Sequence, residues 1–268
     1  MQKTAISSRE RRYTLFLLVL VFTSSHIDRQ IVAILQEPLK QAFQISDTQL
    51  GLLTGVMFAL FYATLGMPMA MWADRKNRRN LIAFSISVWS AMTALCGMAV
   101  HFWQLLLARI GVGIGEAGST PPSHSIISDL YGPNERGTAM AIFGLGVNFG
   151  IMFGYLIGGW VNQWLDWRWA FLIAGLPGLI IALIVRFTMV EPPRGYADGI
   201  TEPPVAPPFL AVVKHMLNDK RLRHLVAANA LISMAGYAAI AWAPVYFQRI
   251  HGFSTGESGT FLAITIGV

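Results

Sequence analysis

Charged residues and cysteine are both scarce in this sequence. Only 13% of its 268 residues are charged, whereas 54% are hydrophobic, and a soluble domain carries about twice that share of charge. The single cysteine, Cys96, lies in an apolar run, which excludes a disulfide framework. The low charge and the long apolar runs exclude one soluble core and indicate an all-α polytopic membrane protein.

Apolar runs long enough to cross a bilayer recur along the chain, since a membrane core takes roughly 20 residues of helix. No small-residue cleavage site follows the first run, so we interpret it as an uncleaved span. The last run stops at residue 268 inside the predicted membrane, so we expect the chain to be part of a longer protein. The predicted spans are 14–35, 50–72, 80–100, 104–127, 138–160, 169–188 and 224–247, with an eighth beginning near 258.

The basic residues are unevenly distributed between the two sides of these spans. With the N-terminus in the cytoplasm, the inner segments hold fifteen Lys and Arg residues and the outer segments hold three. This positive-inside bias predicts a multi-pass protein of a plasma or inner membrane with a cytoplasmic N-terminus. The lipid bilayer accounts for the basic clusters, so no nucleic-acid partner is expected.

The chain divides into three parts. Residues 1–190 are predicted to form a six-helix transmembrane bundle, 191–223 a cytoplasmic linker, and 224–268 the start of a second bundle. Prolines and charges favour a flexible linker, with a short surface helix at 209–217. A weak repeat supports the division, because AFQISDTQLGLL (42–53) and IHGFSTGESGTF (250–261) share Ser at the fifth position and Gly at the tenth. Two parallel six-helix halves are a known transporter design.

Four ionisable residues lie inside predicted spans: Asp28 and Arg29 in the first, Arg109 and Glu116 in the fourth. Each costs several kcal/mol unless it is paired or hydrated. At about 1.5 Å per residue, Asp28 and Arg109 lie at similar depths, roughly 8–12 Å below the outer face. Arg29 has a side chain long enough to reach towards the deeper Glu116. One alternative is a buried ion pair that only joins helices; the other is a charged cluster on a transport pathway.

Three sequence motifs point to a family. The loop AMWADRKNRRNL (70–81), the segment around Arg109 and Gly113, and the stripe GLGVNFGIMFGYLIGG (144–159) resemble motifs of the major facilitator superfamily. Two positions depart from the family pattern: Ala70 and Tyr155 stand where the family usually has Gly and, in antiporters, Pro. The stripe places four glycines on one helix face, where a neighbouring helix can approach closely: Gly146, Gly150, Gly154 and Gly158.

Three further segments, IDRQIVAIL, SDTQLGLLTG and GEAGSTPPSHSIISDLY, resemble the Spinster-like branch of that superfamily. The resemblance implies a major facilitator fold, here the six-helix N-terminal bundle plus one complete and one truncated helix of the second bundle, whose missing half is a partner of this one. It also implies that the 74–79 loop closes the cytoplasmic side. The residues assigned to this gate are Asp74, Arg75, Arg78, Arg79 and Asp129.

The resemblance implies a secondary active transporter that works by alternating access. We predict that Asp28, Arg29, Arg109 and Glu116 bind substrate and couple its movement to protons. Small neighbours of Glu116, such as Gly115 and Ala117, are expected to leave room for water or substrate. The expected substrate is amphipathic or lipid-like with a charged head group. The alternatives are an organic-anion/proton symporter and a non-transporting membrane sensor on the same fold.

Two sequence patterns resemble enzyme motifs but lack the structural context that enzyme activity requires. Residues 113–118 fit GxGxxG, but they lie inside a membrane helix instead of following a strand. Ser123, His124 and Asp129 supply the residue types of a catalytic triad without an oxyanion donor or a nucleophile elbow. We therefore expect no enzyme activity, no cofactor and no metal.

Overall fold

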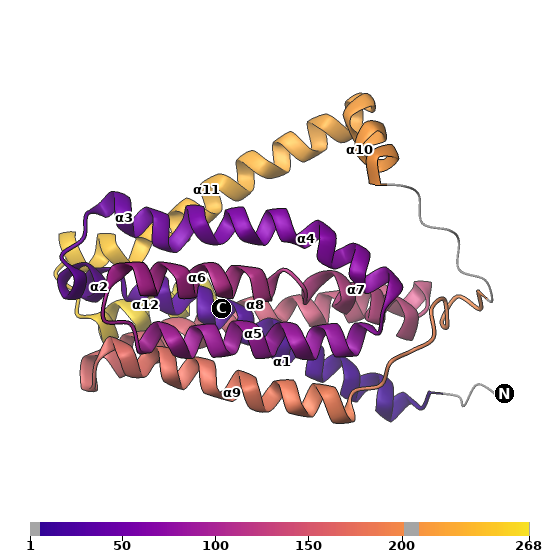
Figure 1. Ribbon diagram of the computed structural model, residues 1–268, viewed down its shortest axis with the longest axis horizontal. Helices are drawn as coiled ribbons and strands as arrows, with labels where there is room; N and C mark the ends of the chain where they lie inside the picture. Colours follow the sequence, from indigo (N-terminus) through magenta and orange to yellow (C-terminus); the bar gives the residue numbers. More distant parts are fainter. Residues whose placement is uncertain (1–5, 201–208, 268) are drawn as a thin grey trace.

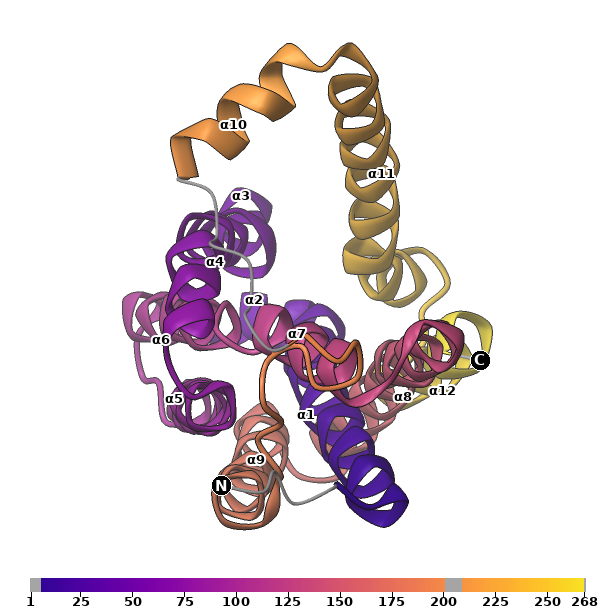
Figure 2. The same cartoon turned by 90° about the vertical axis from the view of Figure 1, so that its right-hand side faces the viewer.

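A computed structural model of the chain describes residues 6–200 and 209–267, and all regular structure in these ranges is helical. Long helices run side by side between two ends of the molecule (Figures 1 and 2). We call the end that carries the basic 75–79 loop the inner end and the opposite end the outer end. The elements are α1 (Ser8–Ile34), α2 (Gln36–Phe43), α3 (Asp47–Gly51), a π-helical turn η1 (Leu52–Val56), α4 (Met57–Arg75), α5 (Arg78–Gly97), α6 (Phe102–Glu116), α7 (Thr120–Leu130), α8 (Pro133–Trp164), α9 (Trp167–Thr188), α10 (Phe209–Asn218), α11 (Lys220–Ile250) and α12 (Thr255–Gly267).

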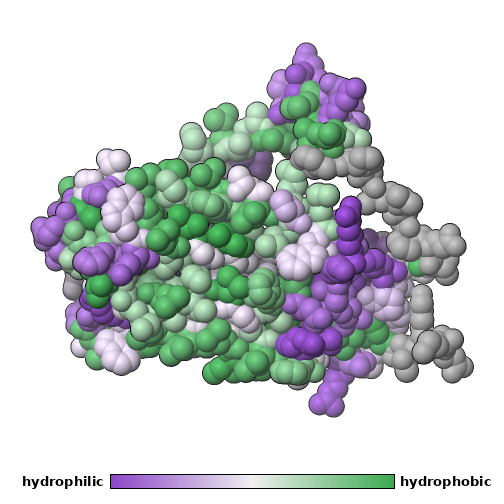
Figure 3. Space-filling model, viewed as in Figure 1, coloured by the Kyte–Doolittle hydropathy of each residue, from purple (hydrophilic) through white to green (hydrophobic). Residues whose placement is uncertain are grey.

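Six helical segments are long and apolar enough to cross a membrane: α1, the continuous α3–η1–α4 segment, α5, α8, α9 and α11. Large apolar side chains are exposed along their middle parts; Ile180, for example, is 61% exposed. Figure 3 shows the resulting hydrophobic belt, with hydrophilic residues gathered at both ends. This is the surface expected of a protein that spans a bilayer. The predicted all-α membrane fold is therefore confirmed.

The predicted fourth span is not one helix. α6 ends at Glu116, residues 117–119 form a turn, and α7 continues to Leu130. Pro121 and Pro122 explain the break, because their missing N–H groups cannot bond to the carbonyls four residues earlier. Glu116 is therefore the last residue of a helix, which the sequence analysis did not anticipate.

Serines of the predicted repeat begin corresponding spans. Ser46 caps α3 and exchanges hydrogen bonds with Gln49, and Ser254 makes the same exchange with Glu257 at the start of α12. Both arrangements are capping boxes, which satisfy free N–H groups at a helix start. The two repeat glycines differ, since Gly259 packs on the Tyr155 carbonyl and Gly51 faces open space.

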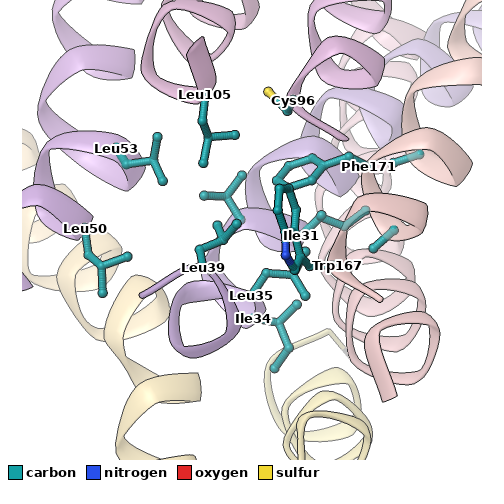
Figure 4. Packing of buried hydrophobic residues seen from close by; sticks show 14 of the residues in the cluster. Ile31, Ile34, Leu35, Leu39, Leu50, Leu53, Cys96, Leu105, Trp167 and Phe171 are labelled. Atoms are coloured by element: carbon teal, nitrogen blue, oxygen red, sulfur yellow. The ribbon is translucent and has the colours of Figure 1, made fainter. Parts of the chain in front are cut away.

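Two apolar clusters form the core. The outer one joins α1, α2, α6 and α9 through residues such as Ile31, Leu39 and Phe171 (Figure 4). The inner one contains Leu18, Trp89 and other residues of α1, α5, α7 and α8. Asp28, Arg29 and Arg109 lie in the sequence between members of the outer and the inner cluster, whereas Glu116 follows Val112 of the inner cluster. We call these buried ionisable residues the polar layer.

The helix α11 lies apart from the first bundle over most of its length. Its contacts with that bundle, mainly with α1 and α2 and also with α3 and α8, involve its outer half, and it diverges from α4 towards the inner end (Figure 1). Its most apolar stretch has no buried residue among those described. The short helix α10, predicted for 209–217, precedes it at the inner end.

Candidate functional site

The buried charges of α1 and α6 form the candidate site. Glu116 is 1% exposed and accepts a hydrogen bond from Arg29 Nε at 2.8 Å. Arg29 Nη2 lies 2.7 Å from the same oxygen, Oε2, in an ion pair, and no described residue donates to Oε1. The predicted reach of Arg29 towards Glu116 is therefore present. A charge-assisted pair of this kind holds its partners more strongly than a neutral hydrogen bond does.

Asp28 and Arg109, which were predicted to lie at similar depths, are neighbours, but their side chains do not form an ion pair. The Arg109 guanidinium donates to the main-chain carbonyl of Asp28 at 3.4 Å, and no ion pair within 4.0 Å joins the two side chains. Both residues are 1% exposed, and neither Asp28 carboxylate oxygen accepts a hydrogen bond from the described part of the chain. Asp28 is therefore a buried acid without a fixed donor.

Aromatic rings of α4 line the charged layer. The Arg29 guanidinium lies 4.9 Å from the centre of the Phe58 ring and 5.0 Å from that of Tyr62. Arg109 lies 5.5 Å from the same Phe58 ring. Cation–π contacts hold a guanidinium without neutralising it. Phe58 and Tyr62 were not predicted from the sequence, although they stand at four-residue spacing on one face of the second span.

The small residues beside Glu116 do not leave open space. A methyl group on Gly115 would meet the Trp89 backbone at 2.6 Å, and one on Gly118 would meet the Ser85 hydroxyl at 2.2 Å. These glycines allow α5 to pack closely against the break after α6. The expectation that small neighbours make room for substrate is therefore wrong at this point.

The predicted gate loop divides into bonded and exposed residues. Arg78 is fully buried and donates to Asp129, to Glu191 (2.8 Å), to Ser125 (2.8 Å) and to the Pro192 carbonyl (2.6 Å). The Arg79 backbone N–H also donates to Glu191.

Two other predicted gate residues do not take part in this network. Asp74 and Arg75 are exposed and form no ion pair within the described residues. A gate role was predicted for both residues. Glu191, which follows the sixth predicted span and binds Arg78 and Arg79 of the basic loop, was not predicted.

The start of the predicted linker is packed under the inner end. Gly195 donates its N–H to Asp129, Arg194 donates to the Ala73 carbonyl, and Arg136 binds Asp198. These bonds join the ends of α4, α7 and α8. Residues 189–200 are therefore part of the inner end. Of the rest of the predicted linker, residues 201–208 lie outside the described residues, and residues 209–223 form α10 and the first turn of α11.

A second ionic cluster lies at the outer end. Arg249 of α11 binds Glu37 at 2.5 Å and both carboxylate oxygens of Asp47 at 2.7 and 3.0 Å, and Lys40 binds Asp47 at 2.7 Å. The hydrogen bonds from Arg249 and then Lys40 hold the pKa of Asp47 below its ordinary value. This cluster ties α11 to α2 and α3. It was not predicted, because its partners are about 200 residues apart in the chain.

The four predicted stripe glycines all face α1. Methyl groups placed on them would meet α1 atoms at 3.1 Å for Gly146, 2.3 Å for Gly150, 2.7 Å for Gly154 and 2.5 Å for Gly158. The distances at Gly150, Gly154 and Gly158 are shorter than real carbon contacts, and the distance at Gly146 is tighter than most, so α1 and α8 could not come this close with larger residues at these positions.

A family profile and similar proteins agree with this architecture. The profile described as "Major Facilitator Superfamily" matches residues 16–268. The chain belongs to the major facilitator superfamily. It is 32% identical to an MFS-type efflux pump of Mycolicibacterium smegmatis, over 93% of this chain and 57% of the relative. It is 25% identical to a probable L-galactonate transporter of Escherichia coli, over 95% of this chain and 58% of the relative.

One solved structure of this superfamily is especially similar. It is a bacterial homologue of the human lysosomal transporter Spinster in an inward-facing, unoccupied conformation, 37% identical, with a TM-score of 0.85 over 96% of this chain and 60% of that one. The resemblance to the Spinster-like branch is confirmed. The chain spans a little over half the length of the relatives that it matches.

Proposed function

We propose that this chain is part of a secondary active transporter that works by alternating access and is coupled to protons. The observation that carries the proposal is the Arg29–Glu116 pair, which is buried inside the helix bundle next to Asp28, a second buried acid without an ion-pair partner among the described residues. Buried charges at membrane depth are costly and usually belong to an ion or substrate pathway. The similarity to transporters of the same superfamily supports this reading.

The pair suggests how substrate and proton could exchange places. Arg29 is 16% exposed at its side chain, and an anionic group that approaches it would compete with Glu116. Once released from Arg29, Glu116 loses the charge that stabilises its ionised form and can take up a proton. Asp28 is the rival proton carrier, because it is a second buried acid and forms no ion pair within 4.0 Å among the described residues. Substrate binding and proton binding would then be linked through Arg29.

The two ionic clusters at the ends support an alternating mechanism. Arg249 with Asp47 and Glu37 links α11 to the first bundle at the outer end, while α11 is separate from it at the inner end. This arrangement resembles the inward-facing conformation of the Spinster homologue. In the proposed cycle the outer cluster breaks when the site opens outwards. The inner end, with Arg78 and Asp129, closes at that stage.

The substrate that we propose is an amphipathic or lipid-like molecule with an anionic head group, moved across a plasma or inner membrane with the N-terminus in the cytoplasm. Arg29 would bind the head group, and Phe58 and Tyr62 offer apolar surface beside it. An organic anion without a long apolar part is the second candidate, favoured by the similarity to the probable L-galactonate transporter.

Uptake into proteoliposomes tests the proposal. Vesicles that contain the protein receive a pH gradient and either a labelled lysophospholipid or a labelled sugar acid. Accumulation of the lysophospholipid that disappears when the gradient is dissipated supports the proposal. Accumulation of the sugar acid alone supports the second candidate. Saturable binding of either compound without movement in any gradient would indicate a sensor instead.

A further inference from the structure

A proline interrupts the hydrogen bonding of α11 in its outer half. Pro244 lies inside the helix and is buried. It has no N–H, so the carbonyl of Ile240, four residues earlier, loses its helical donor. A carbonyl left free at membrane depth costs several kcal/mol unless another group donates to it. This site lies about 15 Å from the outer end of α11 at Ile250, at 1.5 Å per residue.

Tyr155 of α8 donates to this carbonyl. Its hydroxyl lies 3.0 Å from the Ile240 oxygen, and the side chain is fully buried. Gln36, at the start of α2, donates from Nε2 to the next carbonyl, that of Ala241, at 2.5 Å. Gln36 is also fully buried, and the same amide donates to the Ala33 carbonyl at 3.2 Å. Two side chains of the first bundle therefore bind adjacent carbonyls beside the proline of α11.

Tyr155 also stands at a position where the sequence departs from its family. The glycine stripe of α8 usually has proline there in antiporters, and proline has no hydroxyl to donate. The carbonyl of Tyr155 itself lies 2.4 Å from a methyl group placed on Gly259, so α12 packs closely against the same turn of α8. Tyr155 thus connects α8 with both described transmembrane helices of the second bundle.

We propose that Tyr155 and Gln36 are positioning residues that bind the carbonyls beside Pro244 and hold the outer end closed. This inference rests on the proposed alternating mechanism. α11 contacts the first bundle at its outer end, so these bonds form in the present arrangement and must break when α11 moves away there. The hydrogen bonds then favour the outer-closed conformation. Pro244 makes the bond from Tyr155 possible, because the interior of a regular helix has no free carbonyl that could accept it.

The test is a distance measurement across the outer end. Spin labels at Thr48 and Ile250, both exposed, report the separation of α3 from α11 in nanodiscs, in a Cys96→Ala background. Removing one hydroxyl with Tyr155→Phe should raise the ratio of outer-open to outer-closed populations about two- to tenfold, the worth of one hydrogen bond. Gln36→Leu should shift the ratio in the same direction.

The decisive comparison uses Pro244→Ala. Alanine restores an N–H that can donate to Ile240, so Tyr155→Phe should have much less effect in that background. A purely structural role for the tyrosine ring would give the same shift in both backgrounds and would overturn the proposal, as would no shift in either. Tyr246→Phe, on the exposed face of α11, is the matched control and should leave the distances unchanged.

The readout separates this inference from the proposed function. The distances do not depend on substrate or flux. If Tyr155→Phe shifts the populations while no compound is transported, the hydrogen-bond role stands and the transport proposal fails. If flux is normal and the populations ignore both Tyr155→Phe and Gln36→Leu, the inference fails alone. A second label pair within the first bundle, at Thr48 and Leu165, should not change in any variant, which shows that the bundle remains folded.

Discussion

Arg78 is a fully buried arginine at the inner end, and its bonds hold the predicted gate loop in place. Two carboxylates and two neutral acceptors surround its guanidinium. Removing one member of a buried ion pair leaves the others without a partner, which costs about 3–5 kcal/mol. The neighbouring Asp74 is exposed and has no such partners among the described residues.

We predict that Arg78→Ala lowers thermal stability in detergent strongly, by about 3–5 kcal/mol, whereas Asp74→Ala changes it by less than about 0.5 kcal/mol. Both variants should lower transport and shift the balance of conformations while ligand binding persists. Thermal unfolding and ligand titration measure the two effects. Equal losses of binding and flux would argue against a gating role.

Asp47 gives a prediction about pH. Its pKa is lowered by Arg249 and Lys40, so its contribution to outer closure is fully present above its ordinary pKa of about 3.9 and is lost only as the pH falls through the lowered value. Asp47→Asn should therefore open the outer end equally at pH 5 and pH 8, measured with the Thr48–Ile250 label pair. A difference between variant and wild type that shrinks at pH 5 would mean that Asp47 titrates there.

Individual residues were predictable to different degrees. Chain position and side-chain length were enough to predict that Arg29 reaches Glu116, because both are local properties. The Arg249–Asp47 pair depends on where α11 docks, which no local pattern encodes. Glu191 was not predicted, because the prolines that follow it favoured a flexible linker. In the structure it accepts hydrogen bonds from Arg78 and Arg79.

At the scale of elements, helix existence was predictable and helix interruptions were not. Long apolar runs predict α1, α5, α8, α9 and α11, and the repeat serines correctly mark the beginning of two spans. The double proline at 121–122 was a usable signal for the break after Glu116. The π-helical turn at Leu52–Val56 has no comparable signal. It depends on how α3 and α4 meet.

The contact between α1 and α8 leads to the third prediction. A methyl group on Gly150 would lie 2.3 Å from Cβ of His26 and 2.8 Å from the Thr23 carbonyl. Gly150→Ala should therefore destabilise the protein by about 1–3 kcal/mol. Gly144→Ala, with nothing within 4 Å of the new methyl group, should be neutral or stabilising by up to roughly 1 kcal/mol. Thermal unfolding compares them, and equal effects would mean that the stripe does not set the helix separation.

At the scale of the whole molecule, the proposed mechanism connects the outer end, the inner end and the polar layer. The outer end is tied by Arg249, Tyr155 and Gln36, and the inner end of α11 is separate from the first bundle. The buried Arg29–Glu116 pair lies between these ends. A proton that neutralises Glu116 or Asp28 changes the charge of the layer in either conformation. In the proposed mechanism, a proton gradient drives the cycle through this change of charge.

The most direct test of this account is pH-dependent transport by Glu116→Gln in proteoliposomes, with Asp28→Asn beside it. Glutamine mimics the protonated acid and keeps the side chain's size. The account predicts that Glu116→Gln still exchanges labelled substrate across the membrane but no longer accumulates it in a pH gradient. Loss of accumulation only in Asp28→Asn would move proton coupling to Asp28. Full proton-driven accumulation in both variants would contradict the account, because neither buried acid would then carry the proton.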